Sequence, residues 1–161
     1  MKIIVGGAGS VGRSIVDYLS RGNNDIVVVD INQDRLNEIS REFDIQPVLG
    51  SISHPEVQEK IGAEKADILI AATNNDEVNM VACQVGYSLF NIPKKIARID
   101  SEYFLSPLWN TLFNEKNMPV DLAISPDTEI AETILRLIKL SGSREVYPLA
   151  DKKLTLVSFK C

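Results

Sequence analysis

Short apolar runs rich in β-branched residues recur along the chain, and segments with helical spacing of their apolar residues separate them. The runs span residues 2–5, 26–29, 47–49, 67–72, 95–99 and 122–124. Because they lack the alternation of apolar and polar residues that marks a half-exposed strand, they predict strands buried on both faces of a sheet.

Helices are predicted between these runs. Val11, Ile15 and Leu19 recur on one face of a helix that ends near Gly22. Leu36, Ile39 and Phe43 recur at helical spacing and predict a second helix. Further helices are expected at 55–61 and about 76–90, and residues 101–117 are expected to be irregular to helical. The last helix is expected from Pro126 to Leu140, because Ser125 offers a cap, proline follows it and acids occupy the first turn.

Buried strands that alternate with amphipathic helices predict an α/β fold with a doubly wound, Rossmann-like parallel sheet. Right-handed crossovers then give the strand order 3-2-1-4-5-6. After Gly142 the pattern changes, and the segments 145–150 and 154–159 look like two short strands outside the series. They predict a short C-terminal β arm.

Composition narrows the class of partner and the compartment. The chain has 161 residues, enough for one domain with a small appendage, and a net charge of −5 that disfavours a nucleic-acid partner. Cys83 and Cys161 lie too far apart for a metal or redox motif, and Cys83 is expected to be a buried thiol. No signal peptide or convincing membrane span is visible, so a cytoplasmic protein is expected.

The segment Gly7-Ala8-Gly9-Ser10-Val11-Gly12 matches the pattern G-x-G-x-x-G between a predicted strand and a helix. The first glycine permits a tight turn, the second admits a pyrophosphate close to the backbone, and the third allows close packing of helix and strand. N–H groups at the helix start would face the anion. The pattern predicts a dinucleotide site; the alternative is a glycine-rich turn without a ligand.

Asp30 ends the second strand, where a carboxylate can accept hydrogen bonds from both ribose hydroxyls of an adenosine. The alternative is that Asp30 caps the next helix. A carboxylate there repels a 2′-phosphate, so NAD is favoured over NADP. It does not separate NAD from ATP, ADP or AMP, because all of them carry the unphosphorylated ribose.

Two further candidates lie at the carboxyl edge of the predicted sheet, where ligands of such folds bind. Thr73 and Asn74 follow the fourth strand, although Asn74 and Glu77 also have the spacing of a helix-capping pair. Arg98, near the end of the fifth strand, could contact a phosphate or form a surface salt bridge.

Residues that would indicate catalysis are missing. No tyrosine is followed four positions later by lysine, and neither a phosphate-binding Gly-Lys-Ser/Thr loop nor a Gly-x-Ser-x-Gly elbow occurs. The single histidine, His54, lies in a polar loop on the adenosine side. We therefore expect a binding protein rather than an enzyme, with a fragment of an NAD-dependent oxidoreductase as the alternative.

These motifs together resemble a known family. The segments that carry the resemblance are 2–12, Val29-Asp30, Gly50-Ser51, 66–79 and 97–99. They are similar to the TrkA family, the cytoplasmic nucleotide-binding subunits of Trk potassium-uptake systems, whose domain type is called RCK or KTN. The likeness covers residues 1–140. Residues 141–161 resemble a linker and the start of a truncated C-terminal regulatory domain.

The resemblance implies a role for each candidate residue. Gly7, Ala8, Gly9, Ser10 and Val11 would hold the pyrophosphate, and Asp30 the adenosine ribose. Gly50 and Ser51 would lie beside the adenine, while Thr73, Asn74 and Arg98 would line the remaining phosphate and ribose side. The implied ligand is NAD(H), with ATP or ADP as alternatives in the same site.

The resemblance also implies partners and a mechanism. Such subunits form a homodimer or tetrameric ring at the inner face of the cell membrane, against the Trk-type potassium transporter subunit, and nucleotide binding changes the shape of the ring. An apolar stripe on the helix that begins at Pro126 is a candidate interface, or else it packs inside the monomer. The stripe consists of Ile130, Ala131, Ile134, Leu135, Leu137 and Ile138.

Overall fold

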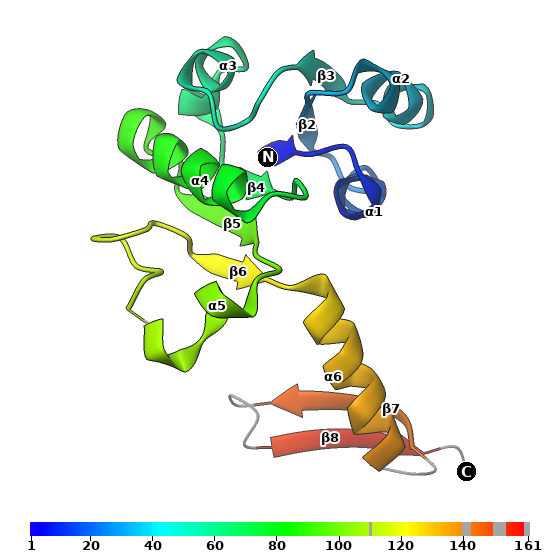
Figure 1. Ribbon diagram of the computed structural model, residues 1–161. Coiled ribbons are helices and arrows are strands. Elements are labelled where there is room, and N and C mark those ends of the chain that lie inside the picture. The colour runs from blue at the N-terminus through cyan, green and yellow to red at the C-terminus, as the bar shows by residue number, and fades with distance from the viewer. Residues whose placement is uncertain (110, 140–142, 150–153, 160–161) are drawn as a thin grey trace. The chain divides into compact units, whose positions relative to one another are not determined.

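Among the described residues, six strands form one parallel sheet in the order β3-β2-β1-β4-β5-β6 (Figure 1). Their bounds are β1 Lys2–Gly6, β2 Asp25–Asp30, β3 Gln46–Leu49, β4 Ile68–Ala71, β5 Lys94–Arg98 and β6 Leu122–Ile124. Every neighbouring pair runs parallel. The predicted doubly wound topology and strand order are therefore confirmed. The order reverses between β1 and β4, where a ligand-binding crevice is expected.

The structure, a computed structural model, describes residues 1–109, 111–139, 143–149 and 154–159. It divides into two units, Met1–Ile124 and Ser125–Cys161. Helix α6, Pro126–Lys139, belongs to the second unit because it contacts β7, Ser143–Leu149. The sequence had placed this helix in the first domain. β7 pairs antiparallel with β8, Leu154–Phe159, as a two-stranded arm.

Helices cover both faces of the sheet (Figure 1). The α-helices of the first unit are α1 Ser10–Leu19, α2 Gln33–Glu42, α3 Pro55–Lys60, α4 Asp76–Phe90 and α5 Glu102–Leu105. Helices α1 and α2 cover one face, and α3 and α4 cover the other. Two single 3-10 turns, η1 Ala63–Lys65 and η2 Pro107–Trp109, lie in the connections. No helix in the described ranges is long and apolar enough to cross a membrane.

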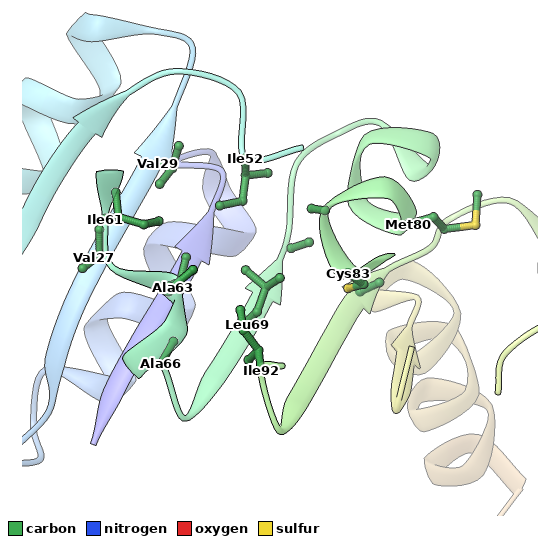
Figure 2. Close-up of a cluster of buried hydrophobic side chains, with 14 of the residues drawn as sticks. Val27, Val29, Ile52, Ile61, Ala63, Ala66, Leu69, Met80, Cys83 and Ile92 are labelled. Carbon is green, nitrogen blue, oxygen red and sulfur yellow. The ribbon is translucent and has the colours of Figure 1, made fainter. Parts of the chain in front are cut away.

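The core consists of two apolar clusters, one on each face of the sheet. Ile3 and Val5 pack in the cluster beneath α1 and α2, whereas Ile4 belongs to the cluster beneath α3 and α4. Figure 2 shows this second cluster, which includes Leu69. The side chains of Ile3, Ile4 and Val5 are 0% exposed. A strand covered on both faces needs an apolar residue at every position, which explains why these runs lack alternation.

A buried amide joins the two helices of the second face. Gln58 on α3 is 0% exposed, and its Nε2 donates to the carbonyl of Ile52 at 2.8 Å and of Ala82, on α4, at 2.9 Å. Its Oε1 has no hydrogen-bond partner. Gln58 therefore holds the loop after β3 against α4.

Candidate functional site

A cavity of about 430 Å³ lies at the carboxyl edge of the sheet, where β1, β2 and β4 end. This volume is within the usual range for small-molecule sites. Every residue that the sequence proposed for the site lines the cavity except Ala8. The lining residues among them are Gly7, Gly9, Ser10, Val11, Asp30, Gly50, Ser51, Thr73, Asn74 and Arg98.

Two glycines of the first loop are required by the fold itself. Gly7 has φ +103°, and a Cβ there would lie 2.8 Å from the carbonyl oxygen of Ala72 after β4. A Cβ on Gly12 would lie 1.8 Å from the carbonyl oxygen of Gly7. Both contacts are too short for a side chain, so these glycines let α1 and β4 approach the turn closely.

Gly9 is different, because nothing in the protein requires glycine there. Its φ of −72° and ψ of −171° suit any residue, and a Cβ on Gly9 would meet no atom within 4 Å. Gly9 nevertheless lines the cavity. It is also the N-cap of α1, whose first turn carries neither a side-chain cap nor an acid. The open space beside the Cα of Gly9 and the N–H groups in the first turn of α1 suit an anion that approaches the backbone.

Asp30 holds the glycine loop as well as facing the cavity. Its Oδ2 accepts from the N–H of Ala8 at 2.6 Å and its Oδ1 from the N–H of Asn32 at 2.8 Å. Asn32, not Asp30, caps α2, because its side chain accepts from the N–H groups of Asp34 and Arg35. The alternative role for Asp30 is therefore wrong. Ala8 does not line the cavity, and its N–H contributes by holding Asp30.

The loop after β4 contains one residue that is free to face a ligand. Asn75 is the N-cap of α4 and accepts from the N–H of Val78 at 2.7 Å, so the expected capping pair of Asn74 with Glu77 is wrong. The Thr73 hydroxyl is 2.7 Å from Oδ1 of Asn79, to which it donates. Asn74 is exposed at the cavity.

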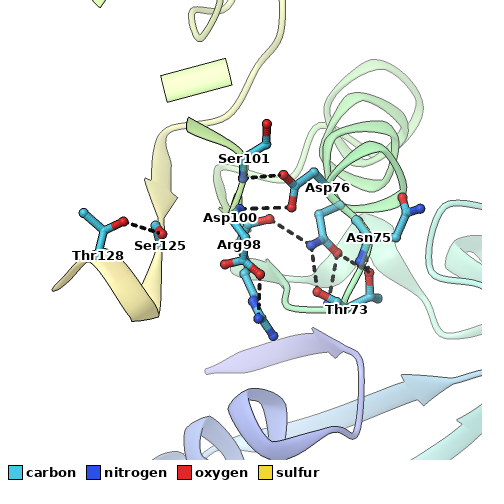
Figure 3. Close-up of polar contacts among 9 residues, drawn as sticks. Thr73, Asn75, Asp76, Arg98, Asp100, Ser101, Ser125 and Thr128 are labelled. Carbon is cyan, nitrogen blue, oxygen red and sulfur yellow. Dashed lines mark hydrogen bonds and ion pairs between the residues drawn. The ribbon is translucent and has the colours of Figure 1, made fainter. Parts of the chain in front are cut away.

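The position of Arg98 is compatible with both roles that the sequence left open. It lines the cavity, and its guanidinium pairs with the Asp100 carboxylate (Figure 3). Asp76, in the first turn of α4, accepts from the N–H groups of Asp100 and Ser101 at 3.0 and 2.9 Å. The segment that carries Arg98 and Asp100 is thus attached to the start of α4.

Further residues on the cavity lining were not found by the sequence reasoning. They are Val29, Ile31, Arg35, Ile52, Ala72, Asn75 and Val78. Ile31 and Ile52 directly follow Asp30 and Ser51, so continuing each predicted loop by one residue would have found them. Arg35 lies in the first turn of α2, for which no site pattern exists. No group of three metal-ligating side chains occurs among the described residues.

Comparison with known proteins relates the chain to potassium-uptake proteins. It is 41% identical over 161 residues to the Trk system potassium uptake protein TrkA of Azorhizobium caulinodans. The aligned region covers 100% of this chain and 35% of that protein. It is 44% identical over 160 residues to the protein of the same name from Vibrio alginolyticus, with 99% and 35% covered. The chain thus spans about a third of the length of these relatives.

Solved structures share the fold. A GsuK channel bound to NAD superimposes with a TM-score of 0.70 at 21% identity, covering 93% of this chain and 25% of that one. A GsuK structure bound to ADP superimposes with a TM-score of 0.66 at 21% identity, covering 84% and 34%. The family model of the TrkA-N domain matches residues 3–126. The chain therefore belongs to the TrkA-N domain family.

Proposed function

We propose that this chain binds NAD(H) in the cavity, with ADP or ATP as competitors, and acts as the nucleotide-sensing part of a regulatory subunit of a potassium transporter. The observation that carries the binding proposal is Gly9, a glycine without a conformational or packing requirement at the edge of a cavity. A pyrophosphate close to the backbone would supply that requirement.

The polar and apolar residues that line the cavity match the successive parts of a dinucleotide. Asp30 would accept the adenosine ribose hydroxyls with the lone pairs that Ala8 and Asn32 leave available. Gly50, Ser51 and the apolar Ile52 would lie beside the adenine. Arg98 and Asn74 would face the second phosphate and ribose. The likeness in fold to channels solved with NAD and with ADP supports both ligand classes.

Sensing requires that the ligand bind two conformations with different affinity. The relatives named as potassium uptake proteins support a transporter of the Trk type as the partner, with this chain peripheral at the inner face of the cell membrane. Since the chain spans about a third of those relatives, the coupling is proposed for the assembled protein.

A homodimer or ring is proposed through α6. Its side chains Ile130, Ile134, Leu135 and Ile138 are 59%, 51%, 54% and 68% exposed. Their exposure favours the interface over the alternative that this stripe packs inside the monomer. Exposed apolar rows on a helix indicate an interaction surface.

Calorimetry with NADH, NAD, ATP and ADP tests the binding proposal. Asp30→Ala should weaken every affinity by about tenfold or more, since hydrogen bonds to a charged group contribute about 1.5–3 kcal/mol. Asp34→Ala is the matched control, because Asp34 is an exposed acid on the neighbouring turn and not on the cavity lining. Equal affinities in the wild type and Asp30→Ala would contradict the site assignment.

Two further measurements test sensing against the oxidoreductase alternative. This protein should capture the membrane subunit of a Trk-type transporter to different extents in the presence of NADH and in the presence of ADP. Equal capture with both nucleotides would contradict the sensing proposal. Sustained NADH oxidation with added carbonyl or quinone oxidants would show an enzyme instead.

A further inference from the structure

We propose that Asn79 is the positioning residue that sets Thr73 and Arg98 at the distance and orientation needed for the second phosphate of the nucleotide. The proposal rests on the proposed function, because it concerns the same cavity. Asn79 lies on α4 and does not line the cavity itself. It acts through residues that do.

The amide of Asn79 is 0% exposed and uses its hydrogen-bonding groups on both sides. Its Oδ1 accepts from the N–H of Thr73 at 3.0 Å and from the Thr73 hydroxyl at 2.7 Å. Its Nδ2 donates to the carbonyl of Thr73 at 3.1 Å and to the carbonyl of Arg98 at 2.9 Å. One side chain therefore contacts the backbone of both arms of the cavity.

The sheet cannot supply this connection. The ladder between β4 and β5 ends at the pair Ala71 and Ala97. Beyond it the chain after β4 leads into α4, while β5 continues to Arg98, which pairs with Ile124 of β6 on its other side. Thr73 and Arg98 lie just past this point, where no strand pairing holds them together. Asn79 replaces the missing ladder bonds with side-chain bonds to Thr73 and Arg98.

Asp76 extends the same connection by one turn of α4. Its carboxylate accepts from the N–H groups of Asp100 and Ser101, which lie directly after Arg98. Side chains three positions apart face the same side of a helix, so Asp76 and Asn79 contact successive parts of one segment. The start of α4 thereby holds the backbone of the segment that carries Arg98 and Asp100.

Asn79 is a polar residue in an apolar surrounding. Its neighbours in sequence, Met80, Ala82 and Cys83, pack in the apolar cluster. Its partners include backbone groups of Thr73 and Arg98, which no substitution removes, and a fully bonded polar network specifies one geometry. The geometry that Asn79 specifies is that of Thr73 and Arg98, and both of these line the cavity.

Gln58 provides a matched comparison within the same protein. It is also an amide at 0% exposure, and its Nε2 likewise donates to two carbonyl groups. Its partners are Ile52 and Ala82. Ile52 follows β3, at the other end of the cavity from Arg98 on β5, and Ala82 lies within α4. Loss of either amide removes a buried polar contact, but only Asn79 contacts the residues assigned to the second phosphate.

The test compares ligands with and without that second phosphate. Affinities of ADP and AMP are measured by calorimetry for the wild type, Asn79→Ala and Gln58→Ala, with thermal melting to confirm folding. Asn79→Ala should weaken ADP about tenfold, which corresponds to roughly 1.4 kcal/mol, and AMP no more than about twofold. Gln58→Ala should leave the ratio of the two affinities at the wild-type value.

Each outcome separates the two proposals. If the wild type binds neither ligand, the proposed function fails. If the wild type binds both, and Asn79→Ala weakens both equally or neither, the positioning role of Asn79 is overturned while the proposed function stands. If Gln58→Ala changes the ratio of the two affinities as much as Asn79→Ala does, the positioning role is also overturned, because the change then reflects general destabilisation of the protein.

Asn79→Asp keeps the shape of the side chain and covers the case in which Asn79→Ala does not fold. The oxygen that replaces Nδ2 would face the carbonyl groups of Thr73 and Arg98, and only a protonated carboxyl could donate to one of them. The ratio of ADP to AMP affinity, taken relative to the wild type at the same pH, should therefore increase as the pH falls. A ratio equal to the wild type at every pH would overturn the proposal.

Discussion

Gly9→Ala separates the demands of the ligand from the demands of the fold. Alanine is a poorer helix N-cap than glycine by some tenths of a kcal/mol to about 1 kcal/mol. Replacement of glycine also restricts the unfolded chain, which stabilises the fold by about 0.4–1 kcal/mol where the backbone conformation suits alanine. The conformation at Gly9 does suit it, and the added Cβ has no neighbour within 4 Å. The free energy of unfolding should therefore change by less than about 1 kcal/mol.

The affinity for NADH should change much more. A Cβ on Gly9 stands where a pyrophosphate would approach the N–H groups of α1, and it would lengthen or break hydrogen bonds to a charged group. Such bonds contribute about 1.5–3 kcal/mol each. A loss of one of them lowers the affinity about 10- to 100-fold.

Calorimetry with NADH and thermal melting measure the two effects on the same samples. Gly12→Ala is the control for a glycine that the fold requires, since its Cβ would lie 1.8 Å from the carbonyl oxygen of Gly7. It should lower the melting temperature, whereas Gly9→Ala should not. Unchanged NADH affinity in a well-folded Gly9→Ala protein would refute the assignment of the open space to the ligand.

Three other changes have definite expected results. Burial raises the pKa of the Cys83 thiol from 9.0 to about 12, so in a Cys161→Ser background the native protein should resist alkylation at pH 9 while the unfolded protein reacts. Because ionisation then favours the unfolded chain, the stability that Cys83 contributes should be intact below about pH 9 and fall as the pH rises toward 12; rapid native labelling would contradict the burial. Asp100→Asn should raise the affinity for ADP a few-fold, since the partly exposed pair with Arg98 contributes roughly 0.2–1 kcal/mol against a competing phosphate, and an unchanged or lower affinity would count against a phosphate role for Arg98. Ile134→Glu on the exposed stripe of α6 should shift the mass measured by light scattering toward the monomer; an unaltered oligomer would exclude this surface as the interface.

Much of the first unit could be predicted because burial determines its pattern. Strands such as Ile26–Val29 have apolar residues on both faces, and this pattern is visible without knowledge of their neighbours. The strand order then follows from the handedness of the crossovers. The glycine loop was predictable for a similar reason: the turn between β1 and α1 gives Gly7 a positive φ and brings Gly12 against the carbonyl oxygen of Gly7.

Bonds between residues far apart in sequence were less accessible. The pattern that includes Asn74 and Glu77 suggested a cap, but the register of α4 makes Asn75 the cap instead. A shift of one residue leaves the capping chemistry unchanged, so local sequence cannot distinguish the two. The same shift decides that Asn74 faces the cavity.

The sequence by itself determined the doubly wound sheet, the glycine loop and the acid at the end of β2, because burial and steric limits act on each residue locally. Only the tertiary structure decided that Asp30 holds the N–H of Ala8, that α6 belongs with the β7 strand, and that Asn79 joins Thr73 to Arg98. These contacts depend on how segments meet in space. A hydrogen bond between an amide on α4 and a carbonyl at the end of β5 has no periodicity along the chain from which it could be predicted.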